Sequence, residues 1–411
     1  MEIRNRHAVL ITPYIPICHG TDNEKRAWQH LQGLKINQRS VSVILLNWQP
    51  SRSPEHIKNL ISQCTSLTLA RCEHMRFASV TELALELFKT LFTQTSPVLL
   101  STNTLKRLAA LYRQIKPDLT FCFCQQSGVA WQQLNALPEF KSHPVILDLN
   151  ALAKRPNHNE FYLTRRYHSF VWSVKDYLVK WIYQHQERQL AQLANRVLVK
   201  SVNEKRQLKP FIKHNKINVL PSAVNLHKKE KKSSDITHIL FVTNFNHWSN
   251  LQALDLLTKD ILPSISQHYE GKLQLDIIGQ PSKAQAQLLL TNPSVKVWNE
   301  SDQLHYLYQR ATLAICPVQY NYNCDSQIIA AMSYGLPVIS TRSAAQALEV
   351  THAKNILFAE SVIEFQQLCI KVIRDDICST TIGENGHYLV KQHYSDYRFQ
   401  HSLSKLIELT V

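Results

Sequence analysis

A short polar loop near the N-terminus, residues 19–26, carries groups suited to binding a phosphate. Gly20 has no side chain, so the backbone can approach a phosphate closely at this point. Lys25 and Arg26 supply positive charge. We expect Gly20 and Arg26 to contact an anionic substrate, and we assign Arg26 a catalytic role. The alternative interpretation is an ordinary solvated loop that starts a helix.

A second polar group follows a run of apolar residues at 144–149, which predicts a buried strand. Asp148 and Asn150 stand at the carboxyl end of this strand, where α/β sheets bind their ligands. We therefore expect acceptor contacts here and assign Asp148 a catalytic role. The alternative is that Asp148 and Asn150 cap the next segment.

Several cofactor and metal motifs are missing from the sequence. It holds only 8 glycines in 411 residues, with no G-x-G-x-x-G and no Walker A loop, which makes a nicotinamide fingerprint and a P-loop improbable. The 9 cysteines form no C-x-x-C, and no H-E-x-x-H occurs, so we expect no metal and no cofactor. Cys122 and Cys124 alternate with phenylalanines, which favours small apolar side chains in a buried strand over a metal or redox pair. This cysteine usage fits a reducing, cytoplasmic compartment.

Strand and helix signals alternate along both halves of the chain. The first half has strand signals at 8–12, 42–47, 119–124, 144–149 and 196–200, and helix signals at 24–36, 81–92, 104–115 and 161–189. The second half has strand signals at 239–242, 273–278, 312–316 and 337–340, and helix signals at 250–262, 304–310, 326–333 and 388–409, the last with a break at 394–396. The alternation predicts an α/β protein with two doubly wound, Rossmann-like domains facing a central cleft.

A lysine-rich stretch without periodicity separates the two halves and predicts a linker. The expected boundaries are 1–227 for the first domain, 228–236 for the linker and 237–393 for the second domain. The remaining segment, 394–411, is expected to be a helix that returns to the first domain.

Positive charge is concentrated in one part of the chain. The formal net charge is +15, and residues 150–235 hold 18 Lys and Arg against 6 Asp and Glu. Trp172 and Trp181 lie among these basic residues. This composition favours reversible contact with an anionic membrane surface or a phosphate-bearing substrate, while the alternative is a solvated helix face. No nucleic-acid-binding motif accompanies the charge, so we expect no nucleic-acid partner, and no apolar run reaches the ~18 residues that span a membrane.

The second half resembles a known family in several segments that occur in the family's order. The most specific is Ile329-Ala330-Ala331-Met332-Ser333-Tyr334-Gly335-Leu336-Pro337-Val338-Ile339-Ser340, and it is preceded by Ile239–Asn244, Leu275–Gly279 and Leu313–Pro317. These residues are similar to the donor domain of GT-B glycosyltransferases of the large retaining group (glycosyl transferases group 1, family 4-like), in which the corresponding run is usually E-A-M-A-x-G-x-P-V-V-x-(S/T). In the first half, Leu10–Pro16, Arg26–Trp28, Val199–Glu204 and Val219–Asn225 resemble the same family more loosely.

The resemblance implies a hexosyltransferase-type enzyme that moves a sugar from a nucleotide-diphosphate sugar to a cell-envelope or other polymeric acceptor. The donor would bind the second domain, and a glycan, lipid-linked or protein acceptor the first. It implies no metal or flavin. From the cysteine usage and the basic region at residues 150–235 we expect a cytoplasmic protein that lies peripherally on the inner face of the membrane. The expected donor-binding residues are Gly20, Thr243, Asn244, Gly279, Cys324, Asp325, Ser326 and Gln327.

The sequence departs from the family where a donor would be held. In the family's R/K-x-x-E-A-M pattern, the basic position falls on Gln327 and the glutamate on Ala330, and an earlier glutamate falls on Tyr322. A departing diphosphate needs positive charge, and a ribose needs a carboxylate. The helix that starts near Ser326 still offers free amides to a phosphate, although a carboxylate at Asp325 would oppose it. Two main hypotheses therefore stand: an active glycosyltransferase, or a degenerate GT-B protein that binds or scaffolds. A third is a related GT-B enzyme, such as a sugar-nucleotide epimerase.

Overall fold

The computed structural model describes residues 6–18, 20–36, 40–46, 54–70, 72–74, 98–150, 152, 170–227, 236–245, 248–289, 291–299, 303–319 and 324–411. The helix predicted at 81–92 and residues 228–235 of the predicted linker lie outside these ranges. So does the beginning of the helix predicted at 161–189, at residues 161–169.

The chain forms two compact units. The first consists of Met1–Pro221 together with Gln400–Val411, and the second of Ser222–Phe399. The boundaries that the sequence predicts at 227, 236 and 393 stay predictions.

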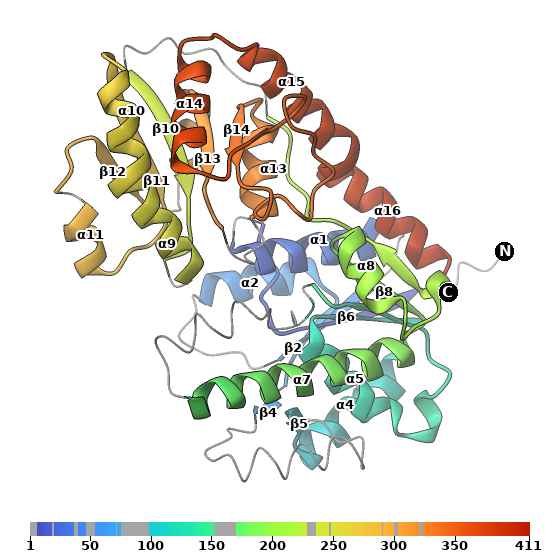
Figure 1. The fold of residues 1–411 in the computed structure, drawn as a ribbon. Coiled ribbons are helices and arrows are strands. Elements are labelled where there is room, and N and C mark those ends of the chain that lie inside the picture. Colours follow the sequence, from blue (N-terminus) through green and yellow to red (C-terminus); the bar gives the residue numbers. More distant parts are fainter. Residues whose placement is uncertain are drawn as a thin grey trace. The chain divides into compact units, whose positions relative to one another are not determined.

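The first unit is built on a parallel sheet of seven strands (Figure 1). Their order across the sheet is β3-β2-β1-β6-β7-β8-β9, and their bounds are β1 His7–Thr12, β2 Ser40–Leu46, β3 Ser66–Ala70, β6 Leu119–Phe123, β7 Val145–Asp148, β8 Arg196–Val199 and β9 Ile217–Val219. A separate antiparallel pair consists of β4 Cys72–His74 and β5 Val98–Leu100. The chain order reverses between β1 and β6, so the sheet is doubly wound.

Helices cover both faces of this sheet. α1 (Asp22–Ile36) lies on one face, and α4 (Thr102–Ile115), α5 (Gln125–Asn135) and α7 (Phe170–Leu193) lie on the other (Figure 1). The remaining elements of the unit are α2 Pro54–Gln63, η1 Pro138–Phe140, α8 Val202–Leu208 and η2 His214–Lys216.

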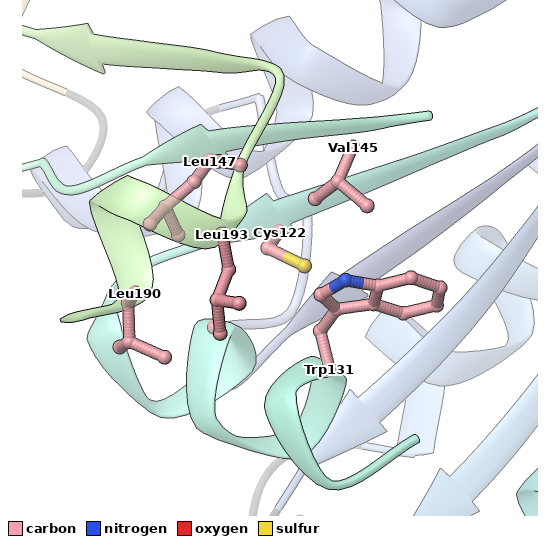
Figure 2. A pocket seen from close by; sticks show the side chains of 8 residues that line it. Cys122, Trp131, Val145, Leu147, Leu190 and Leu193 are labelled. Atoms are coloured by element: carbon pink, nitrogen blue, oxygen red, sulfur yellow. The ribbon is translucent and has the colours of Figure 1, made fainter. Parts of the chain in front are cut away.

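In strand β6, phenylalanines alternate with a cysteine, and the two residue types face opposite sides of the sheet. Phe121 and Phe123 pack against His30 of α1, with ring centroids 4.5 and 5.1 Å apart. Cys122 points to the other face, where it lines a small apolar pocket together with Trp131 of α5 and Leu190 of α7 (Figure 2). Burial raises the pKa of the Cys122 thiol far above its usual range, so it stays protonated and behaves as a small apolar group.

The end of the chain returns to the first unit. α16 (Asp396–Glu408) packs against α1 at Gly33, which has no side chain. A Cβ at this position would collide with Leu403. Gln400 donates a hydrogen bond to the carbonyl oxygen of Gln29 at 3.0 Å. Glycine at this position therefore lets the two helices approach closely.

The second unit has a parallel sheet of six strands in the order β12-β11-β10-β13-β14-β15. The strands are β10 Ile236–Val242, β11 Lys272–Ile278, β12 Val295–Trp298, β13 Leu313–Cys316, β14 Val338–Ser340 and β15 Leu357–Phe358. Its helical elements are α9 Trp248–Leu256, η3 Leu257–Ile261, α10 Leu262–His268, α11 Lys283–Leu289, α12 Leu304–Arg310, α13 Asp325–Ser333, α14 Val362–Ile373, α15 Ser379–Leu389, η4 Val390–Tyr394 and the start of α16. The prediction of two doubly wound parallel sheets is confirmed.

A buried carboxylate organises one face of the second sheet. Asp276 on β11 accepts hydrogen bonds from His238 at 2.8 Å, Trp298 at 2.8 Å and Arg310 at 2.6 Å. Burial opposes its charge, but these hydrogen bonds hold the pKa of Asp276 below its usual value. The guanidinium of Arg310 is therefore held inside this unit by its ion pair with Asp276.

Candidate functional site

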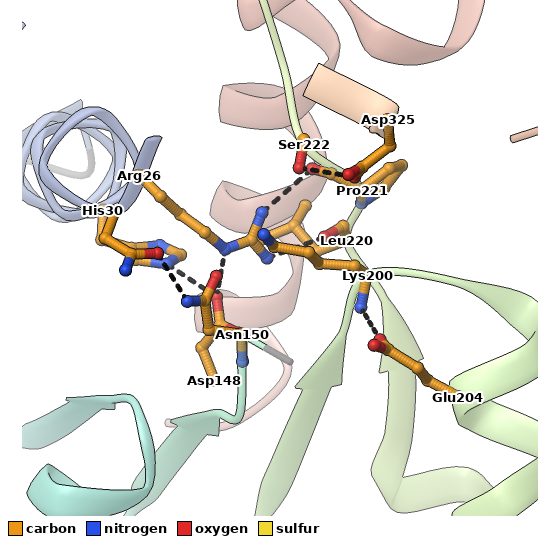
Figure 3. Close-up of polar contacts among 11 residues, drawn as sticks. Arg26, His30, Asp148, Asn150, Lys200, Glu204, Leu220, Pro221, Ser222 and Asp325 are labelled. Atoms are coloured by element: carbon orange, nitrogen blue, oxygen red, sulfur yellow. Dashed lines mark hydrogen bonds and ion pairs between the residues drawn. The ribbon is translucent and has the colours of Figure 1, made fainter. Parts of the chain in front are cut away.

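The carboxyl ends of β1, β6 and β7 in the first unit hold a buried polar cluster (Figure 3). Oδ2 of Asp148 accepts a hydrogen bond from Nε of Arg26 at 2.8 Å and lies 2.7 Å from Nε2 of His30. Arg26 and His30 are one helical turn apart on α1, which places both side chains on the face that covers the sheet. The guanidinium also donates to the carbonyl oxygens of Leu220 at 2.8 Å and Pro221 at 3.2 Å.

Burial and charge set the protonation of this cluster. Burial alone would raise the pKa of Asp148, but the charge of Arg26 and the hydrogen bonds from His30 and Arg26 hold it well below its usual range. Burial lowers the pKa of His30, and the nearby carboxylate does not compensate. At neutral pH the cluster is thus a carboxylate, a guanidinium and a neutral imidazole.

The buried neutral imidazole predicts a pH effect on stability. The pKa of His30 is lower in the folded than in the unfolded chain, so the folded state binds fewer protons and loses stability as the pH falls below ~6.5. We expect His30→Gln to show a shallower fall in the free energy of unfolding between about pH 7 and about pH 5. Urea unfolding at several pH values measures this slope, and equal slopes for both proteins would contradict the assignment.

Asp148 is completely buried, and Arg26 is 3% exposed. The other carboxylate oxygen of Asp148 accepts the backbone N–H of Asn150 at 2.7 Å. This geometry supports a positioning role for both groups, since a paired and buried carboxylate is a weak base. The catalytic roles of Arg26 and Asp148 stay predictions.

Two residues beside the cluster have unusual backbone conformations. Asn150 has φ 62°, and Cys124, which follows β6, has φ 71° and ψ 161°. Such conformations cost about 1–3 kcal/mol each outside glycine and occur preferentially where a fold holds a ligand-binding group. Nδ2 of Asn150 donates to Asn23 at 2.8 Å, while its buried Oδ1 has no hydrogen-bond partner among the described residues. Within the described part of the chain, the Asn150 side chain thus has one paired donor and one unpaired acceptor.

The loop before α1 is closed by its own side chains. The backbone N–H and the hydroxyl of Thr21 both donate to Oε2 of Glu24 at 2.8 Å, an interaction typical of a capped helix start. The N–H of Gly20 donates to the carbonyl oxygen of Ile17 at 3.4 Å. A phosphate contact at Gly20 stays a prediction.

In the second unit, Thr243 and Gly279 meet at the carboxyl ends of β10 and β11. The N–H of Thr243 donates to the carbonyl oxygen of Ile278 at 2.9 Å. A Cβ on Gly279 would collide with the carbonyl oxygen of Thr243 and with the ring of Phe245, so glycine permits this close approach. Thr243 is 3% exposed, and its hydroxyl has no hydrogen-bond partner among the described residues. Asn244 is exposed, and its carbonyl oxygen accepts from Asn250 at 3.2 Å.

The start of α13 stands after β13, beside the point where the chain order of the second sheet reverses. Cys324 precedes the helix, and its side chain makes no capping hydrogen bond. Asp325 is the first helical residue, is 4% exposed and accepts a hydrogen bond from the hydroxyl of Ser222 at 3.0 Å (Figure 3). Its negative charge complements the positive end of the helix dipole.

The substituted family positions share one face of α13. Ser326, Gln327 and Ala330 are partly exposed, while Ile328, Ile329, Ala331 and Met332 are buried. Side chains at positions 327 and 330 therefore reach solvent without disturbing the core. The hydroxyl of Ser326 lies 3.4 Å from Oε1 of Gln327.

Arg342 is a cation that follows the neighbouring strand of the second sheet and packs on an aromatic ring. Arg342 follows β14, and its guanidinium lies 4.8 Å from the ring centroid of Phe358, which ends β15. β15 pairs with β14 on the side opposite β13. Arg342 is exposed, so an anion in solvent can reach its charge.

The predicted site residues thus fall into two groups, one in each unit. Arg26 and Asp148 meet in the first, and Thr243 and Gly279 meet in the second. The partners His30, Asn23 and Ser222 were missed. His30 had a usable signal, its four-residue spacing from Arg26 on a predicted helix. Among the described residues, no cluster of three or more His, Cys, Asp or Glu side chains could hold a metal ion.

Residues 236–375 match the family model of glycosyl transferases group 1. None of the curated proteins matches the sequence.

Solved structures match this chain over nearly its whole length. Sucrose-phosphate synthase from Thermosynechococcus elongatus covers 98% of both chains at 14% identity, with a TM-score of 0.66. Anabaena HepE in complex with UDP and glucose covers 98% of this chain and 99% of its own at 11% identity, with a TM-score of 0.65. The apo lipopolysaccharide outer core galactosyltransferase WaaB covers 98% of this chain and 100% of its own at 13% identity, with a TM-score of 0.60.

At these identities the structural likeness shows the fold, which is the GT-B fold that the sequence predicts. The group 1 domain and this fold together support a transferase that acts on sugars, as the resemblance implies. Within the described part of the chain, none of the helices has both the length and the apolar character needed to cross a bilayer.

Proposed function

We propose that this protein is a hexosyltransferase that takes its sugar from a nucleotide-diphosphate sugar and passes it to a cell-envelope or other polymeric glycan. The observation that carries the proposal is the group 1 domain at residues 236–375, whose six-stranded sheet reverses its order between β10 and β13. Ligands of doubly wound sheets bind at such reversal points, outside the carboxyl ends of the strands.

The donor would lie against Thr243, Asn244 and Gly279, with its diphosphate near the start of α13. The hydroxyl of Thr243 supports this placement, because it is buried and has no partner among the described residues. The backbone at Gly279 is bare, and residues 324–327 begin a helix of nine residues whose first amides face outward along its axis. HepE, which shares the fold, was solved with UDP and glucose.

The acceptor would lie at the strand ends of the first unit, where Asn150 has a positive φ and its side-chain oxygen has no hydrogen-bond partner among the described residues. Such an oxygen can accept a hydrogen bond from a sugar hydroxyl and orient it for attack. The name of WaaB supports a polymer of the cell envelope as the acceptor class. The proposed acceptors are a glycan, a lipid-linked glycan or a glycosylated protein, in the cytoplasm at the inner face of the membrane.

The charge at the start of α13 supports a second candidate function. Asp325 already places a negative charge at the start of α13, and positions 327 and 330 carry Gln and Ala. A diphosphate at this helix would meet the carboxylate of Asp325 and would find no cation at position 327, where the family has one. The alternative is thus a GT-B-fold protein that binds a neutral glycan or a partner without transferring sugar.

A ligand screen separates the two candidates. Uridine and guanosine diphosphates and their sugar conjugates are added to the protein, and thermal unfolding is recorded. A nucleotide at 100 times its dissociation constant should stabilise the second unit by ~2.7 kcal/mol, and transfer should release the nucleoside diphosphate when a glycan acceptor is added. If no nucleotide raises the unfolding temperature and none is released, the transferase proposal is wrong and the binding protein is favoured.

A further inference from the structure

A basic and apolar surface lies at the amino edge of the first sheet, where β8 and β9 begin. Its exposed apolar side chains are Leu193 at the end of α7 and Phe211 in the loop before β9, at 44% and 37% exposure. Lys209 and Lys213 flank Phe211 and are exposed. We call these four residues with Arg196 the amino-edge patch.

Contacts within the unit hold the patch together. The guanidinium of Arg188 lies 3.7 Å from the ring centroid of Phe211. Arg196 donates to the carbonyl oxygens of Asn215 at 3.1 Å and Leu409 at 3.3 Å, which ties the loop and the end of the chain to the start of β8 (Figure 1). Lys216 donates to the carbonyl oxygens of Gln192 and Ala194 at 3.2 and 3.0 Å and so holds the loop against the end of α7.

The charge around the patch has one dominant sign. Residues 188–227 contain eight Lys and Arg and one acid, Glu204. The carboxylate of Glu204 accepts the backbone N–H of Lys200 at 2.7 Å, at the start of α8 and thus beyond the carboxyl end of β8. Glu408, exposed next to Leu409, is one acid against this excess of bases.

We propose that the amino-edge patch docks on an anionic lipid membrane, with Phe211 and Leu193 in the headgroup region and Lys209 and Lys213 on the lipid phosphates. The combination of flanking lysines with an exposed aromatic ring and an exposed aliphatic side chain fits a lipid interface better than a nucleic-acid backbone, because the aliphatic group gains nothing from a phosphate chain. The docking stands on this surface alone and does not depend on the proposed transferase activity.

The position of the patch leaves the candidate site of the first unit uncovered. Parallel strands have all their amino ends at one edge of the sheet, and Arg196 and Ile217 are the first residues of β8 and β9. Asp148 and Asn150 lie at the carboxyl end of the neighbouring strand β7, at the opposite edge. The protein would thus stand on the membrane by one edge of the sheet and bind ligand at the other.

Vesicle co-sedimentation of the full chain tests the docking. Phosphatidylcholine vesicles with and without phosphatidylserine are compared at ~0.1 M and ~1 M salt, between which the Debye length falls from about 10 to about 3 Å. We expect binding to the anionic vesicles at low salt and its loss at high salt. Each lysine at the surface contributes about fivefold, so Lys209→Glu/Lys213→Glu should weaken binding at least ~25-fold.

Two further variants make the result specific. Lys354→Glu/Lys391→Glu changes the net charge by the same amount at exposed positions of the second unit and should retain binding. Phe211→Ser should weaken binding to anionic vesicles without changing its salt dependence. Equal binding to neutral vesicles, or an equal loss in both charge-reversal variants, would overturn the proposal. So would binding of a single-stranded oligonucleotide through Lys209 and Lys213 without vesicle binding, which would identify a nucleic-acid surface.

Discussion

Asp148→Asn is expected to lower the free energy of unfolding of the first unit by about 3–5 kcal/mol. The substitution keeps the shape of the side chain but removes the negative charge that compensates Arg26. The side chain of Arg26 is only 3% exposed. A buried cation without its partner keeps its desolvation cost and loses its attraction. For a unit of this size, ~1 kcal/mol corresponds to about 2–4 °C, so the melting temperature should fall clearly in calorimetry.

An ion pair on the surface of the same unit provides the matched control. Arg113 and Glu139 approach within 2.7 Å, but their side chains are 58% and 43% exposed. Glu139→Gln should therefore cost less than ~1 kcal/mol. In addition, Arg26→Met combined with Asp148→Asn should be less destabilising than the sum of the single changes, because no buried charge is left alone. Similar losses for Asp148→Asn and Glu139→Gln would show that the buried cluster is not the stabilising element.

Gln327→Lys/Ala330→Glu is expected to strengthen binding of nucleoside diphosphates by about 10- to 150-fold, the equivalent of ~1.5–3 kcal/mol for a charge-assisted hydrogen bond. Both positions lie on the partly exposed face of α13, so the new side chains reach solvent without entering the core. Lysine would supply a cation to the diphosphate and glutamate an acceptor for the ribose hydroxyls. Calorimetric titration of uridine and guanosine diphosphates into the parent and the variant measures the gain.

The sign of the introduced charge is the control for this experiment. Gln327→Glu/Ala330→Glu alters the same two positions but places two carboxylates next to Asp325, so it should not improve binding. Titration of the same nucleotides into Arg26→Ala tests the predicted contact of Arg26 with the donor. A melting curve of this variant shows separately how much stability the buried Arg26 contributes. If the lysine variant binds no better than the parent, the donor does not lie against α13 as proposed.

The strands and the helix α13 were predictable because their signals are local. Runs such as Leu119–Phe123 and Leu313–Cys316 are apolar on both faces, as parallel strands covered by helices must be. The register of α13 followed from the run that ends in Gly335-Leu336-Pro337. Short elements such as α8 and β9 were missed, since seven and three residues give too little periodicity to detect.

The sequence by itself determined the two α/β halves, the resemblance to group 1 glycosyltransferases and the loss of charge at Gln327 and Ala330, because each depends on residue type and nearby spacing. Only the tertiary structure decided how Arg26 is used. Its partner Asp148 is 122 positions away in the chain, and its two carbonyl acceptors lie 194 and 195 positions away. From the sequence alone, a cation in a polar loop is expected to be available to a ligand. Folding instead brings three hydrogen-bond acceptors to Arg26 and buries it away from water. Burial of this kind has no signal in the local sequence.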